Sequence, residues 1–240
     1  MKTLTAFSAA LATMATTTAG LALYGNRRLR RRLAAVTGEL AEARSACLHD
    51  PLTGLANRRG ITADLGARLA SGDSWALLLI DLDGFKSVND VHGHAVGDLV
   101  LVETARRLSS VADPGTDLVG RLGGDEFVVL AGSPVGAISM MLAYDAVTML
   151  RQEPFTVDGV RIEVTSSVGV VQVMAGDDAR AVMRSADQAL YRAKAAGGNT
   201  AVEFDPAEPL LTVDSERPNV RTRDMHPLQV PAELGVVIGR

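Results

Sequence analysis

Hydrophobic residues in this chain fall into short continuous runs and into stretches with helical spacing. The run WALLLIDL at 75–82 is continuously apolar up to its last residues, which predicts a strand buried on both faces of a sheet. Apolar residues three and four positions apart predict helices at 58–70, 95–110, 138–151 and 180–196. Turn residues around shorter apolar stretches predict a Gly-Gly hairpin within 117–132, a second hairpin at 155–157 and 161–165, and strands at 167–173 and 200–204.

The order of these elements predicts the fold class. A strand and a helix are followed by two strands, a helix and a strand, with one additional hairpin. This order is typical of a ferredoxin-like α+β fold, in which helices pack against a central sheet.

The N-terminal segment differs from the rest of the chain. An Ala-, Thr- and Leu-rich run at 4–24 is followed directly by NRRLRRR. About 20 apolar residues can cross the hydrocarbon core of a membrane, and flanking arginines favour the cytoplasmic side. We therefore expect a transmembrane helix at 1–25 and a single-pass protein of the cell membrane, with the following domain in the cytoplasm. A weakly ordered terminus and a cleaved signal peptide are the alternatives, although a signal peptide carries its charge before the apolar run.

Composition predicts the other boundaries. Residues 26–48 combine the basic stretch with a polar-faced signalling helix at 33–48, which is a candidate to pair with a copy of itself. The folded domain is expected at 49–204. Residues 205–240 are rich in Pro, Glu, Asp and Arg without periodicity, which predicts a disordered tail, with its apolar LGVVIG stretch as an alternative binding segment.

Charge and size limit the partners. The 240 residues are 47% hydrophobic, which is enough for one full-sized core. The formal net charge of −4 argues against binding to a long nucleic acid, because neutralising many phosphates requires an excess of Lys and Arg. Any nucleotide partner is therefore expected to be small.

Four acidic residues are candidates for chemistry. Asp81 and Asp83 end the central strand, and Asp125 and Glu126 lie on the turn of the predicted hairpin. If these carboxylates converge, they would suit Mg²⁺, and two such ions can stabilise the attacking and leaving oxygens of a phosphoryl transfer. Acids at strand ends are also common as solvated turn residues, and spacing alone favours that interpretation.

Four ordered segments resemble one protein family. RLGGDEFVVL at 121–130 is similar to the signature of the GGDEF family of diguanylate cyclases. The other three, in order, are DPLTGLANRR at 50–59, LLLIDLDGFKSVNDVHGHAVGDLVL at 77–101 and ADQALYRAKAAGGN at 186–199. The resemblance covers about 50–204, so 49–204 is interpreted as a GGDEF domain. It implies the cyclase/polymerase palm, with a central antiparallel sheet flanked by helices.

The resemblance also implies the metal and catalytic residues. The metal ligands would be Asp81, the backbone carbonyl of Leu82, and Asp125. The ion would be Mg²⁺, with Mn²⁺ as an alternative. Asp125 and Glu126 would be the catalytic pair, with Glu126 supporting the metal site.

Substrate contacts follow from the same resemblance. The residues that it assigns to GTP are Asn89, Asp98, His94, Lys86, Lys194, Gly123 and Gly124. Asn89 and Asp98 would recognise guanine, since an amide and a carboxylate complement its O6 and its N1 and N2 donors. The two lysines would offset triphosphate charge, and the two glycines would let the backbone approach the phosphates. His94 lies either near the nucleotide or packed at a helix start.

The implied function is that of a diguanylate cyclase, a transferase in signal transduction that condenses two GTP into cyclic di-GMP and pyrophosphate. Two metals would act in each active site, and a homodimer would be required because each subunit holds one GTP. One departure is Gly198, which stands where the family carries an arginine that contacts phosphate. That loss favours the alternative, a non-catalytic regulator that binds GTP or cyclic di-GMP.

Overall fold

The computed structural model describes residues 26, 28–34, 36–37, 47–132, 136–152, 154–157 and 159–208. By its contacts the chain divides into two compact units, Met1–Cys47 and Leu48–Arg240. In the first unit, residues 28–34 and 36–37 are helical. The expected transmembrane segment 1–25, residues 38–46 of the expected signalling helix and the tail from 209 onward lie outside the described residues. Within the described ranges, no helix is both long and apolar enough to span a membrane.

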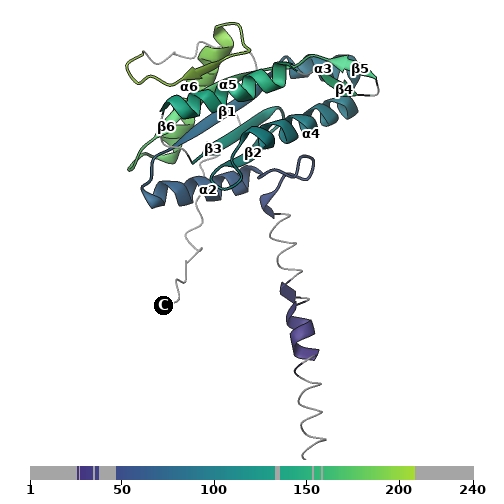
Figure 1. Cartoon of the computed structure of the whole chain (residues 1–240), viewed down its shortest axis with the longest axis vertical. Coiled ribbons are helices and arrows are strands. Elements are labelled where there is room, and N and C mark those ends of the chain that lie inside the picture. Colours follow the sequence, from purple (N-terminus) through teal and green to yellow (C-terminus); the bar gives the residue numbers. More distant parts are fainter. Residues whose placement is uncertain are drawn as a thin grey trace, which may run out of the picture. The chain divides into compact units, whose positions relative to one another are not determined.

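The second unit is built on a five-stranded sheet with the order β2-β3-β1-β6-β7 (Figure 1). The strands are β1 (Trp75–Asp83), β2 (Leu118–Gly123), β3 (Glu126–Ala131), β6 (Thr165–Val173) and β7 (Ala201–Glu203). β1 is the central strand, pairs antiparallel with both β3 and β6, and is buried along nearly its whole length, as its apolar run predicts.

The expectation of a central antiparallel sheet was wrong at one edge. β7 pairs parallel with β6, so the sheet is mixed. The reason is the connection, because helix α6 (Ala179–Ala195) leads from the end of β6 back to its start. The chain therefore re-enters the sheet in the direction of β6.

Helices cover both faces of this sheet. On one face, α4 (His94–Val111) and α5 (Gly136–Gln152) pack with α3 (Phe85–His92) over the side chains of Leu78 and Ile80. On the other face, α2 (Arg58–Ser71) and α6 pack over Leu77 and Leu79. Figure 1 shows α4 and α5 side by side over the sheet. Alternate residues of β1 thus enter two separate apolar layers.

Two elements differ from the sequence prediction. The polar stretch after β1 is the helix α3, which begins after Gly84 and buries Phe85 and Val88 against the core. The second hairpin is shorter than expected, with strands β4 (Phe155–Val157) and β5 (Val160–Ile162). Thr165 belongs to β6 instead, because it pairs with Asp83 in the main sheet.

Candidate active site at the end of the central strand

The end of β1 and the start of β3 bring the predicted acidic residues together. Asp81 lies opposite Glu126 in the antiparallel register. The backbone N–H of Leu82 donates to the carbonyl of Asp125 at 3.4 Å. The turn that carries Asp125 is therefore held against the last residues of β1. Four of the predicted site residues, Asp81, Leu82, Asp125 and Glu126, thus lie at one end of the sheet.

These carboxylates repel one another in a partly buried place. Asp81 is only 7% exposed. Burial, and to a lesser extent the charges of Asp125 and Asp83, raise the pKa of Asp81 to about 6, although Lys194 acts in the opposite direction. Burial and the charges of Asp81 and Asp125 raise the pKa of Glu126 to about 7. The site therefore holds more negative charge than its own cations offset.

Lys194 is the closest cation to this cluster. Its Nζ lies 2.6 Å from Oδ1 of Asp81, and both side chains are mostly buried. The family resemblance assigned Lys194 to the substrate phosphates and did not indicate this ion pair. The pair joins α6 to β1, two elements that are far apart in the chain.

The residues present fit a divalent cation. Asp81, Asp125 and the Leu82 carbonyl offer only oxygen ligands, which is the donor set that Mg²⁺ prefers. Besides burial, repulsion between Asp81, Asp125 and Glu126 contributes to the raised pKa values of Asp81 and Glu126, and a bound cation would relieve that repulsion. Among the described residues, no group of three or more His, Cys, Asp or Glu side chains could hold a metal by themselves. A metal at this position would therefore depend on the Leu82 carbonyl and on substrate oxygens, as is common for Mg²⁺.

The Gly-Gly turn before Asp125 is anchored by an arginine. Gly123 and Gly124 have backbone φ angles of 145° and 58°, which residues with a Cβ rarely adopt. Arg121 donates to the carbonyl of Gly124 through Nε (3.0 Å) and Nη2 (2.8 Å). The same guanidinium lies 3.1 Å from Asp50. The turn is therefore tied to the start of the domain.

Asp50 is suited to that anchoring role. Burial raises its pKa, but hydrogen bonds from Thr53 and the contact with Arg121 outweigh this effect, so the pKa of Asp50 lies below its ordinary value. It therefore stays ionised opposite Arg121. Sequence reasoning missed this contact, although both residues lie in the segments that resemble the family.

The predicted guanine residues lie on two consecutive helices. Asn89 is on α3 and Asp98 is on α4. The Oδ1 atom of Asn89 lies so close to Gly97 that a Cβ at position 97 would overlap it. Asn89 therefore packs beside the residue that precedes Asp98. Lys86 and His94 are exposed in the first turns of the same two helices.

Asp83 has a structural role. Its carboxylate accepts hydrogen bonds from Thr165 Oγ1 (2.8 Å), Ser167 Oγ (2.7 Å) and the backbone N–H of Asn199 (2.9 Å). Gly198, where the family carries an arginine, has φ 74°, and a Cβ at this position would lie about 3.0 Å from the Asp83 carboxylate. The turn that lacks the arginine is thus held against the end of β1.

Replacing Glu126 by glutamine is expected to stabilise the metal-free protein at pH 8. Because the pKa of folded Glu126 is raised, the contribution of this residue to stability is fully present below about pH 4.5 and is lost as pH rises through about 7. Glutamine does not ionise and therefore avoids this loss. With solvent screening, we expect the free energy of unfolding at pH 8 to rise by about 1–2 kcal/mol. Urea unfolding in EDTA at pH 8 and pH 5 measures it. Equal unfolding free energies of the two proteins at pH 8 would contradict the buried position of Glu126.

The fold and the site together define a class of protein. A palm-type sheet with paired carboxylates at the end of its central strand and on the following hairpin is the arrangement of a nucleotidyl cyclase domain. The family model "Diguanylate cyclase, GGDEF domain" matches residues 47–200. The chain therefore belongs to the GGDEF family of diguanylate cyclases, a family of nucleotidyltransferases.

Individual relatives agree with this assignment. An uncharacterized signaling protein of Caulobacter vibrioides is 44% identical over 187 residues, which cover 75% of this chain and 22% of that protein. The response regulator PleD of the same species is 41% identical over 160 residues, covering 64% of this chain and 35% of PleD. The chain thus spans about a fifth and about a third of the length of these two curated relatives.

Solved structures show the same fold. The coiled coil and GGDEF domain of DgcB from Caulobacter crescentus, in complex with c-di-GMP, superposes with a TM-score of 0.65 and 28% identity, covering 73% of this chain and 98% of that chain. Diguanylate cyclase SiaD from Pseudomonas aeruginosa, in complex with its activator SiaC, superposes with a TM-score of 0.62 and 30% identity, covering 84% of this chain and 83% of that chain. The prediction of the cyclase palm is therefore confirmed.

Proposed function

We propose that this domain condenses two GTP into one cyclic di-GMP and two pyrophosphates. The observation that carries the proposal is the pairing of Asp81 with Glu126 beside the Asp125 turn, within a family of diguanylate cyclases. Asp81, the Leu82 carbonyl and Asp125 would hold Mg²⁺ or Mn²⁺. The bound ion would supply positive charge to the α-phosphate and to the pyrophosphate leaving group.

The other site residues would bind and orient the nucleotide. Asn89 and Asp98 would complement the hydrogen-bonding edge of guanine, and rejection of adenine would follow from their unsatisfied polar groups. The substrate residues that would face the phosphates and sugar are Lys86, Lys194, His94, Gly123 and Gly124. Asp125 is the candidate to accept the proton of the attacking 3′-hydroxyl. Glu126 would support the metal site.

Two subunits are needed because each would present one GTP. The 3′-hydroxyl of one nucleotide would attack the α-phosphate of the other, and a second attack would close the ring. For the compact unit Leu48–Arg240, which lacks residues 1–47, specific activity is expected to rise with protein concentration. The measurement is product mass after incubation with GTP and Mg²⁺, together with sizing. A concentration-independent specific activity from a monomer would contradict the dimer mechanism.

A second candidate function is a non-catalytic regulator that binds GTP or cyclic di-GMP. It is favoured by Gly198, since this position lacks the cation that the family places near phosphate. In the same incubation, nucleotide binding without any cyclic product would support the regulator and exclude the cyclase.

We also propose that residues 1–25 anchor the protein in the cell membrane, with the cyclase domain on the cytoplasmic side. This rests on the apolar run and the five arginines at 27, 28 and 30–32. The whole protein should fractionate with membranes, and a reporter fused after Phe204 should be active in the cytoplasm. Recovery of the full chain in the soluble fraction would contradict membrane anchoring.

A further inference from the structure

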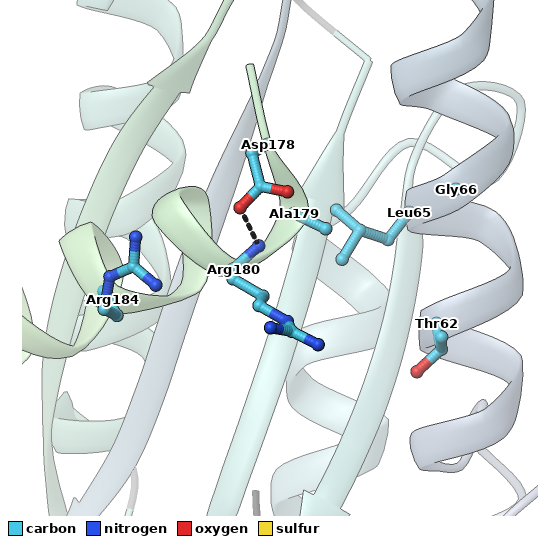
Figure 2. Close-up of a pocket in the computed structure, with 7 residues that line it drawn as sticks. All are labelled: Thr62, Leu65, Gly66, Asp178, Ala179, Arg180 and Arg184. Atoms are coloured by element: carbon cyan, nitrogen blue, oxygen red, sulfur yellow. Dashed lines mark hydrogen bonds between the residues drawn. The ribbon is translucent and has the colours of Figure 1, made fainter. Parts of the chain in front are cut away.

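A cavity outside the proposed GTP site lies between α2 and the start of α6 (Figure 2). Its volume is about 540 Å³, which is within the range of small-molecule pockets. Thr62, Leu65 and Gly66 line it from α2, and Ala179, Arg180 and Arg184 line it from α6. These two helices cover the face of the sheet opposite to α3 and α4, which carry Asn89 and Asp98. The cavity therefore does not belong to the guanine contacts.

Two arginines give the cavity positive charge. Arg180 and Arg184 are one helical turn apart and exposed. Across the part of the chain that the structure describes, the side chains of these two arginines form no ion pair or hydrogen bond. Figure 2 shows the Arg180 guanidinium extending into the space between α6 and Thr62. Arg184 extends from the next turn of α6, away from Arg180 in Figure 2, so its side chain would have to turn toward Arg180 for both guanidinium groups to hold one anion with two charges.

The single carboxylate of the cavity offsets one of the two positive charges but is held by the backbone of α6 and not by the arginine side chains. Asp178 is the N-cap of α6, and its Oδ2 accepts hydrogen bonds from the backbone N–H groups of Arg180 and Ala181, each at 3.1 Å. The hydroxyl proton of Thr62 is also engaged, because Thr62 Oγ1 donates to the Arg58 carbonyl. The arginine side chains are therefore the donors that the cavity offers to a ligand.

The floor of the cavity is apolar. Leu65 is only 2% exposed, and the partly buried Ala179 packs against the core cluster that contains Leu65 (Figure 2). Gly66 contributes no side chain, and a Cβ added there would meet no atom within 4 Å. The cavity thus has room for the body of a ligand beside the place where its anionic group would sit.

We propose that this cavity binds a small organic phosphate, with its phosphate on Arg180 and Arg184 and its apolar part against Leu65 and Ala179. A phosphate monoester carries nearly two negative charges at pH 7, which matches two guanidinium groups. Guanidinium groups can also donate paired hydrogen bonds to phosphate oxygens. This site does not depend on the proposed cyclase activity.

The test is calorimetric titration of the metal-free full-length chain with phenyl phosphate and with inorganic phosphate. Phenyl phosphate is expected to bind more tightly, because only its ring covers the apolar lining. The double variant Arg180→Gln/Arg184→Gln should weaken phenyl phosphate binding by about tenfold or more. Arg151→Gln is the matched control, since it removes an exposed arginine of α5 on the other face of the sheet and should not change the affinity.

A second variant tests the cavity without changing charge. Gly66→Leu places a side chain in the open space and, as leucine is a better helix former than glycine, should preserve α2. It is expected to weaken phenyl phosphate binding about tenfold or more. The proposed site would be contradicted if Gly66→Leu left the affinity for phenyl phosphate unchanged. It would also be contradicted if the Arg151 control lost as much affinity as the double variant. Equal affinities for the two probes would overturn its assignment to an organic phosphate.

Discussion

Asp125→Ala is expected to lower the rate of cyclic di-GMP formation by about 10³-fold or more, without unfolding the domain. The Asp125 side chain is one of the two carboxylates among the proposed metal ligands, and its loss leaves developing phosphate charge uncompensated. The fold should tolerate the change, because the structural contact of Asp125 is made by its backbone carbonyl with Leu82. In EDTA, stability should be unchanged or higher, because Asp125 raises the pKa values of both Asp81 and Glu126 by repulsion.

The matched control is Asp73→Ala, which removes an exposed acid from the turn between α2 and β1. It should leave both the rate and the unfolding free energy unchanged. Initial rates are measured from product mass at saturating GTP and Mg²⁺. Near wild-type turnover in Asp125→Ala would show that the catalytic carboxylate lies elsewhere.

Lys194→Met should produce the largest loss of stability among these substitutions. In EDTA at pH 8 the variant leaves the Asp81 carboxylate buried without its ion-pair partner, which costs about 2–4 kcal/mol. The loss should shrink at pH 5. The pKa of folded Asp81 is already raised to about 6, so at pH 5 the carboxyl group is largely protonated in both proteins and needs no partner.

Two comparisons test this interpretation. Adding Asp81→Asn to Lys194→Met should restore most of the lost stability at pH 8, because no buried charge remains. Lys86→Met, at an exposed position of α3, should leave stability unchanged at both pH values. Urea unfolding of the four proteins gives the free energies. A loss of the same size at pH 5 and pH 8 would mean that Lys194 stabilises the fold by packing, and that its ion pair with Asp81 contributes little.

Local patterns predicted most of the elements. The continuous apolar run of β1 and the helical spacing of α2, α4, α5 and α6 placed these elements to within a few residues. Such patterns are enough to predict an element because burying one face of a helix repeats apolar residues every three or four positions, and burying both faces of a strand gives a continuous apolar run. α3 was missed because it is short and mostly polar, and its helical state depends on burying Phe85 and Val88 against other elements.

By itself, the sequence determined the family, the order of the elements and the set of acidic residues at the strand end. Spacing alone did not distinguish Asp81 from Asp83, which are both acids at the end of β1, and only the family resemblance assigned Asp81 to the metal. Tertiary structure separates them, because Asp83 is held by Thr165, Ser167 and Asn199, whereas Asp81 faces Lys194. The ion pair requires α6 to lie close on β6, where Gly169 leaves no room for a Cβ below Ala186 and Leu190. Contacts between such distant segments depend on packing in three dimensions, and the local spacing of apolar residues along the chain does not predict them.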